Sequence, residues 1–168
     1  MAAIVKFVSS VAAVMLAFGI TTAALAIEAL PDAQFVGFIQ QANDFELDSS
    51  RLALQKSENQ AIHIYAKRLI SKSQLPFQGA QSGTRRLRAD GRRLATRYTS
   101  VLDRLRTLDG EAFDKAYAGA QLKAQLDIID EVGAYAREGS NADLRRFAVD
   151  VLPRFQSELE HARQLPGR

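Results

Sequence analysis

Cysteine is absent from this 168-residue sequence. Its absence excludes disulfide bonds, thiol catalysis and cysteine-ligated metal sites together. A glycine-rich phosphate loop, a dinucleotide-binding fingerprint and a nucleophile-and-base spacing are missing as well. Histidine, the commonest metal ligand in proteins, occurs only as His63 and His161. Because these absences remove the usual signals of an enzyme, we expect a protein without catalytic activity.

The sequence also lacks a sustained alternation of apolar and polar residues, which argues against β-strands. Apolar residues instead recur at helical spacing in four long segments and one short segment. The expected helices cover residues 32–57, 58–75, 98–108, 113–138 and 141–165. The predicted fold is therefore an all-α four-helix bundle with one additional short helix.

Several helix ends and one helix interior carry specific signals. Asp32 and Asn141 are typical N-cap residues. Gly139 is expected to adopt the left-handed conformation that ends the fourth helix. Pro153 predicts a kink inside the last helix, because proline removes one backbone hydrogen bond. The apolar stripe of the fourth helix is expected to contain Phe113, Tyr117, Leu122, Leu126, Ile129 and Val132.

The first 26 residues resemble a secretory signal peptide. They combine a single charge, Lys6, with an apolar stretch over 11–20 and the small-residue end Ala24-Leu25-Ala26. This pattern predicts cleavage before Ile27 and export to the periplasm or beyond. The alternative is an uncleaved anchor, the only case in which membrane contact is expected, because residues 7–26 are just long enough to span a bilayer. Cleavage leaves a single domain over residues 27–168.

Removal of Lys6 lowers the net charge from +3 to +2, but positive charge remains concentrated in one segment. The cluster consists of Arg85, Arg86, Arg88, Arg92, Arg93 and Arg97. It can contact an anionic envelope component, such as lipid headgroups or a cell-wall polymer. A solvent-exposed loop and helix surface is the simpler interpretation. Nucleic acid is not an expected partner, because no aromatic residues interleave with the arginines to stack on bases.

Glu46 is the sharpest single signal in the chain. It falls on the apolar stripe of the first helix, with Phe35, Ile39, Ala42, Ser49 and Ala53. A carboxylate at such a position is costly unless it is hydrogen-bonded, protonated or bound to a cation. Glu46 is therefore either a buried acid satisfied by neighbouring polar groups, which is the favoured interpretation, or a metal ligand.

The last helix contains one Glu-x-x-His pair, Glu158 and His161. Di-iron carboxylate bundles need two such pairs and a glutamate from each of two further helices. Only half of that set is present, so a divalent metal is the weaker hypothesis and no cofactor is expected.

Several stretches carry a family resemblance. They are Glu46-Leu47 with Ala53, the run of residues 65–70, the run LDGEAFDKAY over residues 108–117, Phe147-Ala148 leading to Leu152-Pro153, and the late run of residues 159–162. From Phe35 to Leu165 the chain resembles the bacterial family called domain of unknown function 4142 (DUF4142), whose members are exported and similar to ferritin-like bundles. The resemblance implies a ferritin-like four-helix bundle.

The resemblance also locates interior polar positions. Where the family carries histidines, this chain has Lys72-Ser73, Gln125 and Glu158. The remaining oxygen donors suit calcium or magnesium better than iron or zinc. The resemblance implies two alternatives: a metal site formed by Glu46, Gln125, Glu158 and His161, or a hydrogen-bonded network of Glu46, Ser73, Gln125 and Glu158 that shares a proton. The network is the favoured interpretation.

We therefore expect an exported, non-enzymatic helical bundle that acts as an envelope binding or stress-related module. The alternative is a ferritin-like metal-binding or redox protein with a degenerate carboxylate site.

Overall fold

The computed structural model describes residues 28–73 and 96–167, and all regular structure in these residues is helical. The helices are α1 (Asp32–Lys56), α2 (Gln60–Ser73), α4 (Thr96–Arg106), α5 (Gly110–Glu138) and α6 (Ala142–Ala162). The prediction of an all-α bundle is confirmed. The predicted signal peptide and the arginines from Arg85 to Arg93 lie outside the described residues.

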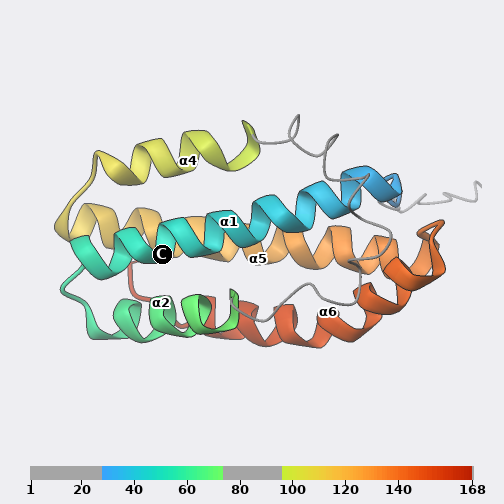
Figure 1. The fold of residues 1–168 in the computed structure, drawn as a ribbon. Helices are drawn as coiled ribbons and strands as arrows, with labels where there is room; N and C mark the ends of the chain where they lie inside the picture. The colour runs from blue at the N-terminus through green and yellow to red at the C-terminus, as the bar shows by residue number, and fades with distance from the viewer. Residues whose placement is uncertain (1–27, 74–95, 168) are drawn as a thin grey trace, which may run out of the picture.

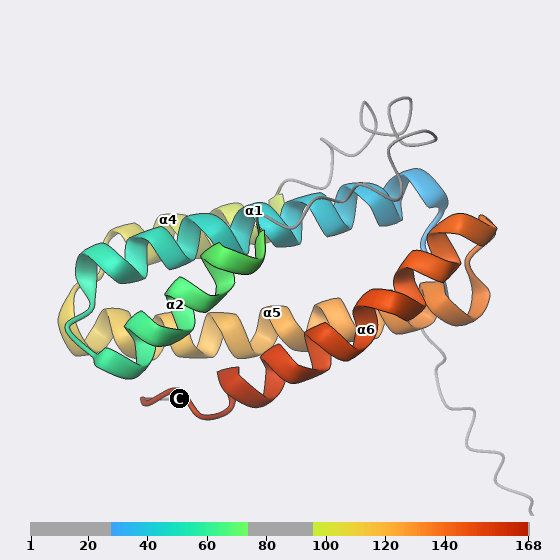
Figure 2. The same ribbon diagram turned by 60° about the horizontal axis from the view of Figure 1, so that its bottom comes forward.

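The two longest helices, α1 and α5, form the centre of the bundle (Figure 1). α1 and α2 form one pair of consecutive helices, and α5 and α6 form another. α4 packs against α1 and α5 on one side, while α2 and α6 lie on the opposite side (Figures 1 and 2). None of the helices in the described part of the chain is long and apolar enough to cross a membrane.

The described helices enclose two apolar clusters. The first is built around Phe35, Phe45 and Val132, and the second around Ala53, Leu69 and Phe113. Between them α1, α5 and α6 contribute buried polar side chains: Glu46, Ser49, Ser50, Gln121, Gln125 and Glu158. Burial of apolar surface in the two clusters is the main stabilising contribution, and the polar layer must be satisfied by hydrogen bonds.

The start of α1 differs from the prediction. Asp32 is the first residue of the helix and its side chain makes no N-capping hydrogen bond, because Pro31 occupies the N-cap position. The Asp32 carboxylate instead accepts hydrogen bonds from the hydroxyls of Tyr135 and Ser140. It therefore ties α1 to the turn between α5 and α6. The predicted N-cap of α6 is confirmed, since the Asn141 side chain accepts from two backbone amides of the first turn.

The end of α5 also differs from the prediction. Gly139 has φ −56° and ψ 142°, so it does not adopt the left-handed conformation. Glycine is required for another reason: a Cβ atom at this position would lie 2.4 Å from the ring of Tyr135. That ring cannot easily move, because it stacks on Phe35 with 3.8 Å between the ring centroids.

The predicted apolar stripe of α5 is only partly correct. Phe113, Tyr117 and Val132 are fully buried, but Leu126 is 42% exposed and Leu122 and Ile129 are half-buried. The helix turns Gln121, Gln125 and Ile128 inward instead. α6 continues through Pro153, whose predicted kink stays a prediction.

Candidate functional site

The interface between α1 and α5 contains three polar pairs. Gln125 Nε2 donates to Glu46 Oε1 at 2.6 Å, and Gln121 Nε2 donates to Ser49 Oγ at 2.8 Å. The hydroxyls of Ser50 and Tyr117 lie 3.3 Å apart. The first two pairs are spaced by about one helical turn on each helix, which matches the periodicity of two packed helices. Together they form a buried polar seam.

Glu46 is the acidic member of this seam and is 3% exposed. Burial raises its pKa from 4.5 to about 7. The hydrogen bond from Gln125 and the positive charge of Arg154 lower this pKa, and the negative charge of Glu158 raises it. Burial is the largest of these effects, so the net shift of the pKa is upward. Glu46 is therefore an acid that titrates near neutral pH inside the bundle.

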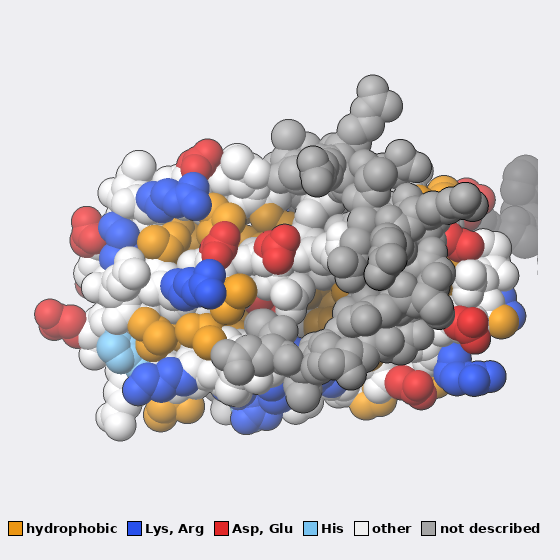
Figure 3. Space-filling model, in the orientation of Figure 1, with side chains coloured by type: hydrophobic (Ala, Val, Ile, Leu, Met, Phe, Trp, Pro, Cys, Tyr) orange, Lys and Arg blue, Asp and Glu red, His pale blue; other side chains and the backbone are white. Residues whose placement is uncertain are grey.

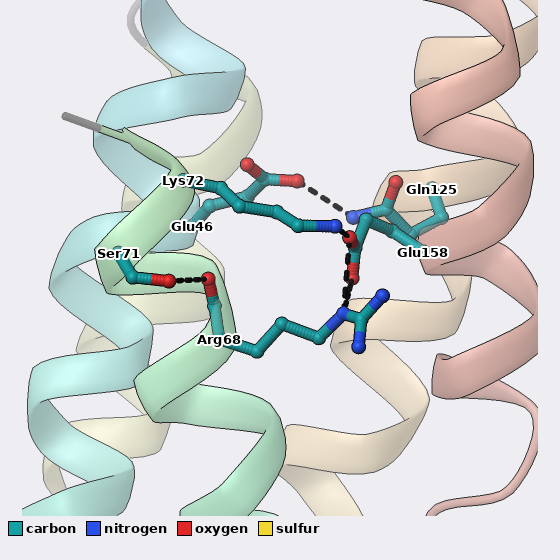
Figure 4. Close-up of polar contacts among 6 residues, drawn as sticks. All are labelled: Glu46, Arg68, Ser71, Lys72, Gln125 and Glu158. Carbon is teal, nitrogen blue, oxygen red and sulfur yellow. Dashed lines mark hydrogen bonds and ion pairs between the residues drawn. The ribbon is translucent and has the colours of Figure 1, made fainter. Parts of the chain in front are cut away.

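Glu158 is the second buried acid and is 1% exposed. Arg68 Nε lies 3.3 Å from Glu158 Oε1 and 3.2 Å from Oε2, and Lys72 Nζ bonds to Oε1. Both cations come from α2, as Figure 4 shows. Charge-assisted hydrogen bonds of this kind compensate a buried carboxylate. The ion pairs thus connect α2 to α6.

The charged groups around Glu46 and Glu158 carry more positive than negative charge. Two carboxyl groups, of Glu46 and Glu158, face the cations of Arg68, Lys72 and Arg154. Three cations outnumber two acids, and Glu46 is neutral when protonated. A further divalent cation would have to displace a tethered one, because excess positive charge opposes its binding.

The structure brings three of the predicted site residues together: Glu46, Gln125 and Glu158 (Figure 4). His161 lies one turn beyond Glu158 on α6 and is half-buried. Ser73 ends α2, but its side chain lies outside the described part of the structure, as does that of Arg97 in α4. Within residues 28–73 and 96–167, no group of three or more His, Asp or Glu side chains is arranged to hold a metal ion.

A tyrosine borders this cluster. Tyr65 is 3% exposed, and its hydroxyl and Gln125 Oε1 are both buried without a hydrogen-bond partner among the described residues. Burial, together with the negative charge of Glu46, raises the pKa of Tyr65, and the nearby Gln125 side chain offsets this only in part. The hydroxyl therefore stays protonated at neutral pH and can only donate or accept a hydrogen bond.

Sequence reasoning missed Arg68 and Gln121 and did not assign Lys72 an ion pair. Arg68 and Lys72 are four residues apart, so they lie on one face of α2 and can reach a common acceptor. That spacing was the available signal, but their partner Glu158 is 86 positions beyond Lys72. Gln121 carried no comparable signal, because its burial follows from the rotation of α5 about its axis.

The comparisons with known proteins give one match. The family described as Domain of unknown function (DUF4142) matches residues 20–165. No curated protein and no solved structure matches the chain.

Proposed function

Since the chain belongs to the DUF4142 family, whose function is unknown, we propose that it is an exported, non-enzymatic helical bundle that acts as an envelope binding or stress-related module. The observation that supports this proposal best is the state of the two buried acids. Glu158 is paired with Arg68 and Lys72, and Glu46 accepts a hydrogen bond from Gln125. These contacts pair both buried acids with donors from neighbouring helices and so hold the helices together, which is a structural role.

The partner proposed for this module is an anionic envelope component. The support comes from the sequence, in which Arg85 to Arg97 includes six arginines and a single acid, Asp90. Opposite charges raise the local concentration of a partner and its rate of association, and salt weakens the effect. We expect replacement of these six arginines by serine to release the protein from isolated cell envelopes at 0.1 M salt. Envelope association that survives the replacement would contradict this assignment.

The alternative function is a metal-binding or redox protein with a degenerate site. The observation in its favour is the proximity of Glu46 and Glu158 to the unpartnered oxygens of Gln125 and Tyr65. Oxygen donors of this kind bind hard cations such as calcium, magnesium or manganese. The carboxylate oxygens of Glu158 already accept hydrogen bonds from Arg68 and Lys72, which is why the structural role is the stronger proposal.

Metal analysis of the protein purified from the periplasm separates the two functions. We expect far less than one equivalent of iron, manganese, calcium or magnesium per chain, in the wild type as in Glu46→Gln and Glu158→Gln. One equivalent that both substitutions remove would establish the metal-binding function and defeat the structural one. Asp44→Asn is the matched control, because Asp44 is an acid of α1 that lies outside the polar layer.

A further inference from the structure

Among the described helices, α2 carries the largest net positive charge. α2 contains Lys67, Arg68 and Lys72 and no carboxylate. The other described residues contain 12 Lys and Arg against 18 Asp and Glu, a net charge of −6. α2 is thus the most basic described helix, followed by α4 with three arginines and one aspartate, whereas α1, α5 and α6 are net acidic. Figure 3 shows basic side chains along the lower left edge of the molecule, where Figure 1 places α2.

The outward face of α2 combines this charge with an apolar side chain. Ile62, Tyr65, Ala66 and Leu69 face the core and are buried. Ile64 is 62% exposed, the highest value among the large hydrophobic residues of the described structure. Lys67 and Arg68 follow it by three and four residues, so they lie beside it on the same face. An exposed isoleucine flanked by cations offers a membrane surface one apolar contact next to positive charge.

Two of the three cations of α2 also form ion pairs with a buried acid. Arg68 and Lys72 hold Glu158, yet their side chains remain 38% and 26% exposed. Long basic side chains bury their aliphatic parts while the charged ends stay near water. Lys67 is exposed, and no ion pair of this residue is found within the described part of the chain. The face therefore retains positive charge that a partner can use.

We propose that the exposed face of α2, formed by Ile64, Lys67, Arg68 and Lys72, is a contact surface for a bilayer of anionic phospholipids. This inference rests on the proposed envelope function and assigns it a partner and a place on the bundle. The charge of the face complements anionic headgroups, and Ile64 inserts at the boundary between headgroups and acyl chains. The net acidic helices α1, α5 and α6 are repelled by the same membrane, which favours contact through α2.

Vesicle sedimentation tests the proposal with the full protein. The vesicles consist of equal parts phosphatidylglycerol and phosphatidylcholine, or of phosphatidylcholine alone, in 0.1 M salt. All variants are prepared in the same form, so that the residues before Glu28 and the arginine-rich segment contribute equally. We expect binding only to the anionic vesicles. Lys67→Ser should lower the partition coefficient about five-fold, the effect of one basic residue near an anionic surface. Ile64→Ser should lower it by a similar factor of about five, because it removes apolar surface that inserts into the bilayer.

Two matched variants control for changes of charge and of apolar surface elsewhere. Lys123→Ser removes an exposed lysine of α5, and Val149→Ser removes a 55% exposed valine of α6. We expect each to change binding less than about two-fold, because neither residue lies on α2. Thermal unfolding followed by circular dichroism verifies that every variant is folded.

Each result decides a separate point. A wild-type protein that shows no preference for anionic vesicles overturns the inference and weakens the proposed partner. Binding that Lys67→Ser and Ile64→Ser change no more than their controls do overturns the inference alone and leaves the arginine-rich segment as the contact. Loss of binding in Lys67→Ser but not in Ile64→Ser overturns the insertion of Ile64, because the contact is then with the anionic headgroups alone.

Discussion

Gln125 on α5 donates a hydrogen bond to the buried carboxyl of Glu46 on α1, with 2.6 Å between Nε2 and Oε1. The two residues are 79 positions apart in the sequence, and their bond lies between two apolar clusters. A neutral donor stabilises a buried carboxylate less than a cation does. Glu46 therefore keeps a proton at a pH at which exposed acids have lost theirs.

The raised pKa of Glu46 makes stability depend on pH. The folded protein binds the proton at about pH 7, whereas the unfolded chain binds it at 4.5. The stabilisation from protonated Glu46 is fully present below pH 4.5 and is lost as the pH rises to about 7. The difference corresponds to about 3 kcal/mol. We expect Glu46→Gln to match the wild type at pH 4 and to exceed it by up to about 3 kcal/mol at pH 8, measured by urea unfolding. A constant difference between the two proteins at all pH values would contradict this assignment.

Replacement of Gln125 should intensify the same effect. Gln125→Leu removes the donor that lowers the pKa of Glu46. The pKa should rise further, and the fold should lose about 1–3 kcal/mol at pH 8, with a smaller loss at pH 5. The measurement is again urea unfolding at the two pH values.

Gln121→Leu is the matched control for that change. Gln121 lies one turn earlier on α5 and bonds to Ser49 Oγ, which also donates to the carbonyl of Phe45 at 2.5 Å. Gln121 Oε1 has no partner among the described residues. Gln121→Leu should therefore lower the free energy of unfolding by less than about 1 kcal/mol, and the decrease should not depend on pH. A strong pH dependence in this variant would show that the seam acts as a unit.

The sequence alone predicted the burial of Glu46, because helical periodicity places it in line with Phe35, Ile39 and Ala42. It also predicted the five helices of residues 28–73 and 96–167 to within a few residues at most ends, since turn and capping residues such as Asn141 act locally. It could not predict the partners of Glu158. Arg68 and Lys72 are 90 and 86 positions from Glu158 and meet it only in the folded bundle, so no local signal encodes that contact.

The rotation of α5 was equally beyond local reasoning. Leu122 and Leu126 form a plausible apolar stripe, but the helix contacts α1, α4 and α6 at once. Packing against these helices places Gln121 and Gln125 in the interior, where their side chains donate hydrogen bonds to Ser49 and Glu46. Once both partners are in place, hydrogen bonds offset the cost of burying amides.

Gly139 offers a test of packing at the end of α5. Gly139→Ala adds a Cβ atom 2.4 Å from the Tyr135 ring, which is held by Phe35 and by the hydrogen bond to Asp32. Because the backbone angles of Gly139 suit alanine, any loss of stability in this variant comes from the steric conflict with the Tyr135 ring. We expect the free energy of unfolding to fall by about 1–3 kcal/mol.

Gly119→Ala is the control for Gly139→Ala. Gly119 lies in the interior of the same helix, and nothing lies within 4 Å of an added Cβ atom. Alanine should stabilise the helix there by about 0.5–1 kcal/mol, because it restricts the unfolded chain. Thermal unfolding of the two variants should thus move in opposite directions. Equal shifts would mean that the Tyr135 ring yields without cost.

The ion pairs of Glu158 should behave as one unit. Arg68→Met and Lys72→Met each leave one cation on the carboxylate, so each change should cost about 1 kcal/mol. The double variant leaves a carboxylate that is 1% exposed without either partner, and we expect it to lose about 3–5 kcal/mol. The loss should exceed the sum of the single changes, because the second substitution removes the last compensating charge.

Adding Glu158→Gln to the double variant distinguishes a buried unpaired charge from lost packing. The amide has the same shape and no charge, so most of the lost stability should return if the carboxylate is the cause. Glu160→Gln is the matched control, since Glu160 is an exposed acid of the same helix that pairs with Arg163. It should restore nothing. Recovery with Glu160→Gln, or none with Glu158→Gln, would show that the lost stability does not come from an unpaired buried carboxylate at Glu158.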